Sequence, residues 1–232
     1  MPISGKVFLY LNPEDFSLEE IARKLKTWSE EETFETPDED YTLLTNVEDV
    51  GYDDEELHGI YMYDSVVIHT WRGVPTATPY TTVAPFLFTE KDEEKFLIIL
   101  APKSVSNRVA NKLSTIIHGA QGTIVEPVIR SDKFDEFQGD TEATKIMLFD
   151  DIEIPNMNKA TLYGDNVQQT DLFNNFVSIG RPWYMVSKTK NRGWTVGIVR
   201  DGTIVVFNTV EREAFIEFLK EKIFPMTLRR GQ

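Results

Sequence analysis

Residues 57–71, LHGIYMYDSVVIHTW, form a run of mostly β-branched and aromatic side chains, a composition typical of a β-strand. Two similar runs follow, PYTTVAPFLFTE at 79–90 and KFLIILAP at 95–102. The connections between them, RGVP at 72–75 and EKDEE at 90–94, contain residues suited to turns. The three runs therefore predict an antiparallel meander, and this meander sets the fold class.

Other elements flank the meander on both sides. Before it, residues 6–11 predict a strand. A helix is then predicted to begin after Ser17, with Glu20 in the position of a capping box. After it, residues 104–119 have helical periodicity and end at a glycine. The first half of the chain thus has the order strand, helix, three antiparallel strands, helix.

The second half has a similar predicted order. A strand at 122–129 is followed by a polar link and by a strand at 145–151. A helix at 165–180 then begins at Asp165, which is a typical N-cap residue. The remaining elements are three strands and a closing helix, predicted at 183–190, 194–200, 203–208 and from Thr209 onward.

These two orders predict an α+β protein of two similar lobes, each a mostly antiparallel sheet with helices on one face. The N-terminal lobe would span 1–120, including an acidic loop at 30–56, and the C-terminal lobe 121–232. The order suggests an internal duplication and resembles that of the duplicated halves of the TATA-binding-protein fold. The resemblance concerns topology alone and implies no function.

The composition excludes several classes of protein. The chain has 232 residues, of which 41% are hydrophobic, and this is enough to bury a full core. No apolar run approaches the roughly 18 residues of a membrane-spanning helix. The chain has no cysteine, so disulfides, thiol nucleophiles and cysteine metal ligands are excluded. We expect a soluble, cytoplasmic protein without membrane contacts.

The negative charge is concentrated in one segment. The net charge is -14, and residues 30–56 contain thirteen acids and no lysine or arginine. The rest of the chain is therefore nearly neutral, with a net charge of -1. One interpretation of this segment is a solvated, partly disordered connection. The other is an acidic arm that binds a basic partner or covers a basic surface of its own protein.

The segment IMLFDDIEIP, residues 146–155, places carboxylates in an apolar run. Strand alternation puts Asp151 and Glu153 on one side and Asp150 in the more apolar row. Together with Asp165, these side chains are the alternative catalytic set, and Asp151 and Glu153 are the alternative ligands for Mg²⁺, which prefers oxygen donors. Equally, the strand could end near residue 149, and the aspartates would then lie in a turn.

Two segments are basic and contain no acid. One runs from 95 to 121 and includes Arg108 and Lys112, which are four residues apart and would share one helix face. The other runs from 172 to 200 and includes a predicted hairpin tip at 187–194. Basic residues interleaved with aromatic ones suit phosphate binding and base stacking. The candidate contact residues for a partner or nucleic acid are Arg108, Lys112, Arg181, Lys188, Lys190, Arg192 and Trp194.

The sequence thus favours a non-catalytic binding or scaffolding module without a cofactor. It would contact a protein partner through the basic hairpin and the basic helix, and nucleic acid is a second candidate ligand of the same surface. The acidic segment would recruit a basic partner or shield the basic surface. The alternative is a metal-dependent phosphoester hydrolase that resembles a nuclease and uses the clustered carboxylates with Mg²⁺.

Overall fold

The computed structural model describes residues 2–12, 15–36, 39–53 and 55–227. Within these residues it contains twelve β-strands and five α-helices, which confirms the α+β class. The chain divides into two compact units, one formed by Met1–Leu9 with Glu126–Gln232 and the other by Tyr10–Val125. Of the described helices, none is both long enough and apolar enough to span a membrane.

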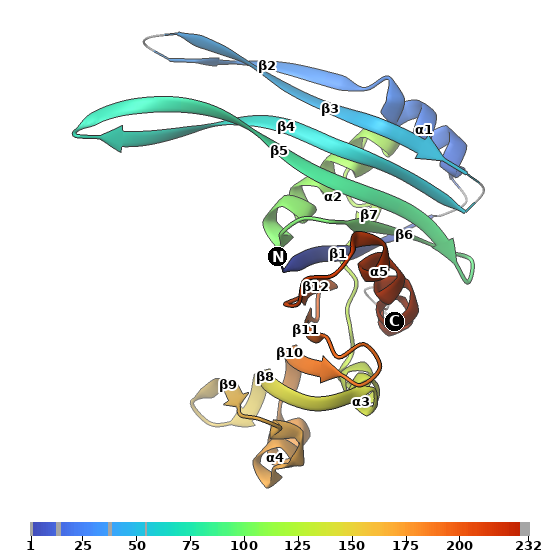
Figure 1. Ribbon diagram of the computed structural model, residues 1–232, viewed down its shortest axis with the longest axis vertical. Coiled ribbons are helices and arrows are strands. Elements are labelled where there is room, and N and C mark those ends of the chain that lie inside the picture. Colours follow the sequence, from blue (N-terminus) through green and yellow to red (C-terminus); the bar gives the residue numbers. More distant parts are fainter. Residues whose placement is uncertain (1, 13–14, 37–38, 54, 228–232) are drawn as a thin grey trace. The chain divides into compact units, whose positions relative to one another are not determined.

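The unit of residues 10–125 is a five-stranded antiparallel sheet in the order β2-β3-β4-β5-β6. Helices α1 and α2 lie against one face of this sheet (Figure 1). The bounds are α1 Leu18–Lys26, β2 Ser29–Glu35, β3 Asp40–Tyr52, β4 Glu56–Trp71, β5 Val74–Lys91, β6 Glu94–Ile99, α2 Lys103–His118 and β7 Ile124–Val125.

Local sequence signals account for both helices of this unit. The hydroxyl of Ser17 accepts a hydrogen bond from the backbone of Glu20, whose carboxylate accepts one from the backbone of Ser17, so the expected capping box is present. Helix α2 ends at Gly119, whose φ of 74° is readily adopted only by glycine. The apolar stripes of the helices, including Leu25 and Leu113, are fully buried.

The acidic segment is not the loop that its charge suggested. Its described residues form nearly all of β2 and β3, and these strands pair from Ser29 with Asn46 to Glu35 with Asp40. Alternating threonine, tyrosine, valine and leucine in β3 supply strand-forming side chains between the acids. Strand β2 is the edge of the sheet in this unit, and its glutamates are exposed. Charge on an edge strand discourages edge-to-edge aggregation.

The hairpin of β4 and β5 is longer than its neighbours. Its pairing runs from Glu56 with Thr89 to Trp71 with Val74, whereas β3 pairs with β4 only as far as Tyr63. In the distal half of the hairpin, beyond Tyr63, β4 and β5 therefore pair only with each other. Several large apolar side chains there are exposed, namely Val67, Ile68, Trp71, Val74 and Tyr80.

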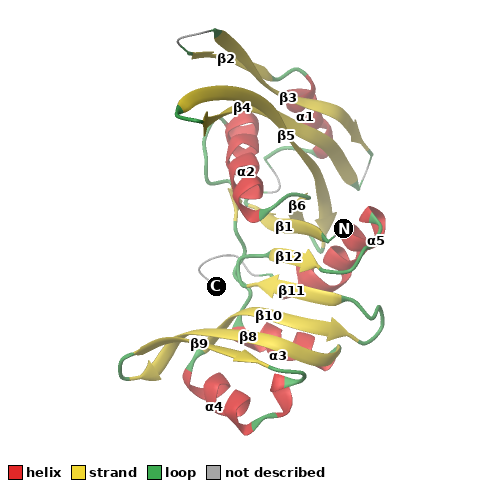
Figure 2. Cartoon of the chain, turned by 60° about the vertical axis from the view of Figure 1, so that its left-hand side comes forward, coloured by secondary structure: helices red, strands yellow, loops and turns green. Residues whose placement is uncertain are grey.

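The other unit is also antiparallel, with strand order β1-β12-β11-β10-β8-β9 (Figure 2). Its strands are β1 Ile3–Tyr10, β8 Thr141–Ile154, β9 Met157–Tyr163, β10 Arg181–Thr189, β11 Thr195–Val199 and β12 Thr203–Val206. Its helices are α3 Ser131–Gly139, α4 Asp171–Ile179 and α5 Arg212–Phe218, with shorter helical turns at Val167–Gln169, Leu219–Ile223 and Phe224–Met226.

Two local expectations in this unit were wrong. The helix near residue 170 begins after Thr170, whose hydroxyl accepts from the backbone of Phe173, and not after Asp165. Strand β8 continues past Phe149 to Ile154, but its register breaks after Asp150, and Asp151 has a φ of 50°. Aspartate tolerates this left-handed backbone, so the strand bulges there and does not end.

Each half of the chain does contain a strand, a helix, further strands and a closing helix. Five strands, not three, separate the two helices in each half, and α4 interrupts the second series. Because element order is compatible with many topologies, it does not establish a duplication.

Candidate functional site

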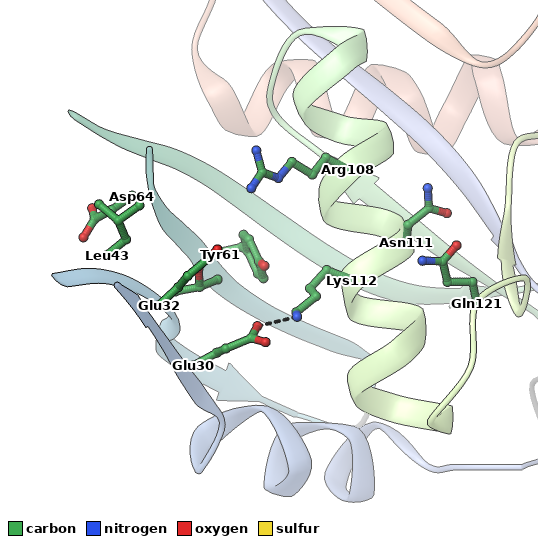
Figure 3. Close-up of a pocket in the computed structure, with 10 residues that line it drawn as sticks. Glu30, Glu32, Leu43, Tyr61, Asp64, Arg108, Asn111, Lys112 and Gln121 are labelled. Atoms are coloured by element: carbon green, nitrogen blue, oxygen red, sulfur yellow. Dashed lines mark hydrogen bonds and ion pairs between the residues drawn. The ribbon is translucent and has the colours of Figure 1, made fainter. Parts of the chain in front are cut away.

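A polar pocket of about 400 Å³ lies between helix α2 and the sheet face formed by β2, β3 and β4. Figure 3 shows Arg108 and Lys112 extending from the helix toward the acidic strands. Its volume falls in the range of roughly 300–1,000 Å³ that is usual for small-ligand sites. The lining residues are Glu30, Glu32, Leu43, Thr45, Tyr61, Asp64, Arg108, Asn111, Lys112 and Gln121.

Helical and strand periodicity place the charges on facing walls. Arg108 and Lys112 are one helical turn apart, as the sequence predicted, and both line the pocket. Glu30 and Glu32 are two residues apart on β2 and therefore point to the same side of the sheet. The helix wall is thus cationic and the strand wall is anionic.

Lys112 is bound within the pocket. Its ammonium group donates a hydrogen bond to the carboxylate of Glu30, which lies 82 positions earlier in the chain. The same ammonium group lies 5.2 Å from the centre of the Trp28 ring, and that ring stacks on Tyr61 with the centroids 6.3 Å apart. An aromatic face attracts a cation, so Lys112 is held from two sides. The acidic segment therefore covers one basic residue of its own protein.

Arg108 is in a different situation. Its guanidinium carbon lies 4.2 Å from the centre of the Tyr63 ring, and this contact fixes the plane of the group. Within the described ranges of the chain, no carboxylate lies within 4.0 Å of its nitrogens. Glu32 has the converse arrangement, since its exposed carboxylate has no cationic side chain within that distance among the described residues. Among the described residues of the lining, Arg108 therefore has no carboxylate partner, and Glu32 has neither a cation nor a hydrogen-bond donor.

Two further side chains define the polarity of the pocket. Asp64 accepts hydrogen bonds from the hydroxyl of Thr81 at 2.6 Å and from the backbone of Leu44 at 3.0 Å. These bonds, that of Thr81 foremost, hold the pKa of the Asp64 carboxyl below its usual value, so it stays ionised at neutral pH. Burial raises the pKa of the Tyr61 hydroxyl, which therefore remains a neutral hydrogen-bond donor.

In the other unit, the cations of the hairpin at 187–194 contact groups of their own unit. The ammonium of Lys188 lies 2.8 Å from Glu142, and that of Lys190 donates to the carbonyl of Gly139 at 2.7 Å. Arg192 donates to the carbonyl of Ala214 and to Glu221, 3.2 and 2.9 Å away.

Trp194 belongs to the same cluster. Its ring lies 5.8 Å from that of Phe218, and the guanidinium of Arg192 covers it at 5.1 Å. The hairpin residues proposed from sequence therefore all have structural partners within their unit.

The carboxylates of β8 are also engaged by arginines. The two nitrogens of the Arg200 guanidinium bind the two oxygens of Asp150 at 3.1 and 2.8 Å, a bidentate pair that is half-buried. Asp151 lies 3.6 Å from Arg181, and both of these side chains are exposed. Asp150 thus has a named partner, which sequence reasoning missed because the two residues are 50 positions apart.

The remaining members of the predicted carboxylate set lie apart from any such contact. Glu153 and Asp165 are exposed, on β8 and before the short helical turn at 167. In the part of the chain that the structure describes, no three His, Asp or Glu side chains gather closely enough to hold a metal ion. The geometry gives the hydrolase alternative no specific support.

Sequence reasoning found the cations of the pocket and missed its aromatic wall. Tyr61 lines the pocket, and Trp28 and Tyr63 lie against its two cations. Trp28 precedes β2 and the tyrosines are on β4, so their proximity depends on the register of β2, β3 and β4. The alternation within residues 57–71 was the one available signal, because it places Tyr61 and Tyr63 on the same side of a strand.

Comparison of the sequence with models of known protein families gave no match, and comparison with curated proteins gave none either.

Proposed function

We propose that the protein is a non-catalytic binding module that contacts a protein partner through the basic face of α2. In this proposal Arg108 and Lys112 receive an acidic group of the partner, and Glu30 occupies the position of that group in its absence. The observation that carries the proposal is the difference between the two cations. Lys112 already binds a carboxylate, whereas Arg108, oriented by Tyr63, has none within reach among the described residues.

Shielding by Glu30 gives the module a simple form of control. A partner carboxylate must replace Glu30 on Lys112 or bind beside it on Arg108. The ion pair between Lys112 and Glu30 is partly exposed, with 33% and 54% of the two side chains accessible, so its net stability is about 0–1 kcal/mol. A ligand whose carboxylate replaces Glu30, and which also makes favourable contacts elsewhere, can gain more binding free energy than this ion pair contributes. Because the charges face solvent, binding should weaken as salt is added.

A protein partner is favoured over nucleic acid by what surrounds the cations. Glu30, Glu32 and Asp64 line the same pocket, and their charge opposes the approach of a phosphate backbone. The distal β4 and β5 hairpin of the same unit exposes Val67 and Trp71, which strand alternation places on one face, and exposed apolar surface of this kind is typical of protein contacts. In the second basic segment, the hairpin cations already have internal partners.

The test is a titration of the ¹⁵N-labelled protein with the peptide acetyl-Gly-Glu-Gly-amide, followed by the backbone resonances of α2 and the indole of Trp28. We expect changes confined to the pocket, weaker on adding salt. Binding should be strengthened by Glu30→Gln and lost in Arg108→Gln. Arg23→Gln is the matched control, since Arg23 is an exposed helical cation on α1 paired with Glu19.

Absence of any pocket response at millimolar concentration, both to this peptide and to peptides that carry a lysine beside the glutamate, would refute the proposal. A response to a twelve-nucleotide single-stranded DNA that exceeds the peptide response and depends on Lys188 and Lys190 would instead favour nucleic-acid binding. Deleting the whole acidic segment is not a suitable test, because its strands belong to the sheet.

We also propose, as a separate matter of ancestry, that the two halves arose by duplication with an element order like that of the TATA-binding-protein fold. Each half begins with a strand and a helix and ends with a helix after five strands, with α4 added among the strands of the second half, and this common succession supports the proposal. Superposition of experimental structures of the strands that keep the same order in both halves, β4-β5-β6 and β10-β11-β12 with their closing helices, tests it, and a failure of these elements to superpose would refute it.

A further inference from the structure

Arg108 and Glu32, the two charged side chains of the lining without a bonded partner among the described residues, define the ligand more closely than the cations alone. We propose that the ligand is a peptide segment that carries both an acidic and a basic side chain, the acid bound by Arg108 and the base by Glu32. This inference rests on the proposed function, because it assigns the chemistry of the partner at the same site.

Glu32 carries a charge that no cation of the described residues neutralises. Its neighbour on the same strand face, Glu30, is neutralised by Lys112, but Glu32 is left as an exposed carboxylate. Strand β2 pairs Glu32 with Leu43 and Glu30 with Thr45, so no basic residue lies opposite either of them on β3. Unless a ligand supplies a cation, this wall of the pocket keeps its negative charge.

The anionic strand wall restricts which anionic ligands can bind at Arg108. A ligand bearing only negative charge gains one contact at Arg108 and is repelled by Glu32 and Asp64. A ligand with an added ammonium or guanidinium group gains a second ion pair at Glu32 and removes most of that repulsion. The pocket therefore discriminates by charge pattern, since it penalises ligands of a single sign.

The uncharged residues of the lining suit a peptide ligand. Asn111 and Gln121 carry side-chain amides that can both donate and accept hydrogen bonds, as a peptide backbone requires. Tyr61 and Leu43 supply apolar surface on the strand wall. A volume of about 400 Å³ accommodates a few residues of an extended chain and is larger than a single free amino acid needs.

The experiment compares pairs of peptides that differ only in the basic residue. The probes are acetylated and amidated peptides with one Glu and with Lys one, two or three positions after it, each matched to a peptide with Gln in place of Lys. At one of these spacings we expect the Lys peptide to bind the wild-type protein roughly two- to fivefold more tightly than its Gln counterpart.

Variants of β2 show whether the gain arises at the assigned residue. In Glu32→Gln the advantage of the Lys peptide should disappear, while binding of the Gln peptide should improve slightly. Glu31→Gln is the matched control, because Glu31 carries the same charge one position away and points to the other side of the strand. The Lys advantage should persist in that control, and both variants should unfold at the same temperature as the wild-type protein.

The outcomes separate this inference from the proposed function. If the peptides bind with dependence on Arg108 but Lys gives no advantage at any spacing, the inference fails and the proposed function stands. If no peptide binds, both fail. If free lysine binds as tightly as the best peptide, the site accepts a small zwitterion, and the assignment to a peptide segment is overturned.

Discussion

The basic helix α2 and the basic hairpin at 187–194 look alike in sequence and differ in structure. Each lies in a segment without acidic residues, and each has aromatic residues near it in the fold or the chain. In the hairpin, Lys188, Lys190 and Arg192 all bind groups within their own unit. In the helix, Lys112 is shielded by Glu30, and Arg108 keeps an open guanidinium group.

The charge of a short sequence segment is therefore a poor guide to the charge that a partner can contact in the folded protein. The acids that neutralise the hairpin lie on β8 and in the helical C-terminal region, and residue 30 is 82 positions from its lysine. A cation is available for a partner only if the fold brings no carboxylate or carbonyl to it. The hairpin cations should therefore contribute mainly to stability, and Arg108 of the helix mainly to binding.

The largest expected effect is on the stability of the hairpin unit. Arg192→Ala removes two hydrogen bonds and the cation above Trp194 and Phe218, while Glu217 and Glu221 lose a neighbouring charge. Summing a partly buried charged hydrogen bond and a cation-π contact, we expect a loss of about 2 kcal/mol in the free energy of unfolding. Urea denaturation followed by circular dichroism measures it, and a change no larger than that of Lys188→Ala would contradict the structural role.

A smaller effect is expected at the helix. Arg108→Gln removes one cation-π contact at an exposed position, so the free energy of unfolding should fall by about 0.5–1 kcal/mol. The same variant should abolish peptide binding in the pocket. If stability falls as far as in Arg192→Ala, or if binding survives, the distinction between the two basic regions is wrong. Thermal melting and the peptide titration together provide the measurement.

The smallest expected effect is a pH dependence of the free energy of unfolding that arises from the hairpin region. A hydrogen bond from Arg192, with smaller contributions from Lys222, holds the pKa of the Glu221 carboxyl below its ordinary 4.5. Because the pKa of this carboxyl is lower in the folded protein than in the unfolded protein, the ion pair stabilises the fold fully at pH values above the unfolded pKa. This stabilisation is lost as the pH falls through the pKa of the folded protein.

Glu221 is largely exposed, so the contribution should be about a few tenths of a kcal/mol. Denaturation of the wild-type protein and of Glu221→Gln between pH 7 and pH 3 tests this. The stability difference should be present at pH 7 and shrink toward zero below pH 4. A difference that is constant over this range would show that the ion pair does not contribute.

The sequence predicted elements where its local signals were strong. The capping box at Ser17, the glycine that ends α2 and the β-branched runs of the meander all correspond to observed elements. Local signals were misleading where tertiary pairing overrode them. Strand β3 forms within an acidic segment because two neighbouring strands complete its hydrogen bonds, and strand β8 continues through its aspartates because Asp151 adopts a left-handed backbone.

By itself the sequence determined the α+β class, the antiparallel meander, the concentration of acid in one segment and the shared helix face of Arg108 and Lys112. These features depend on periodicity and composition, which act over a few residues. The tertiary structure alone decided that Glu30 binds Lys112, that Arg200 binds Asp150 and that the cations of the hairpin are paired. Side-chain partners are set by strand register and helix packing, and these bring together residues that no local pattern connects.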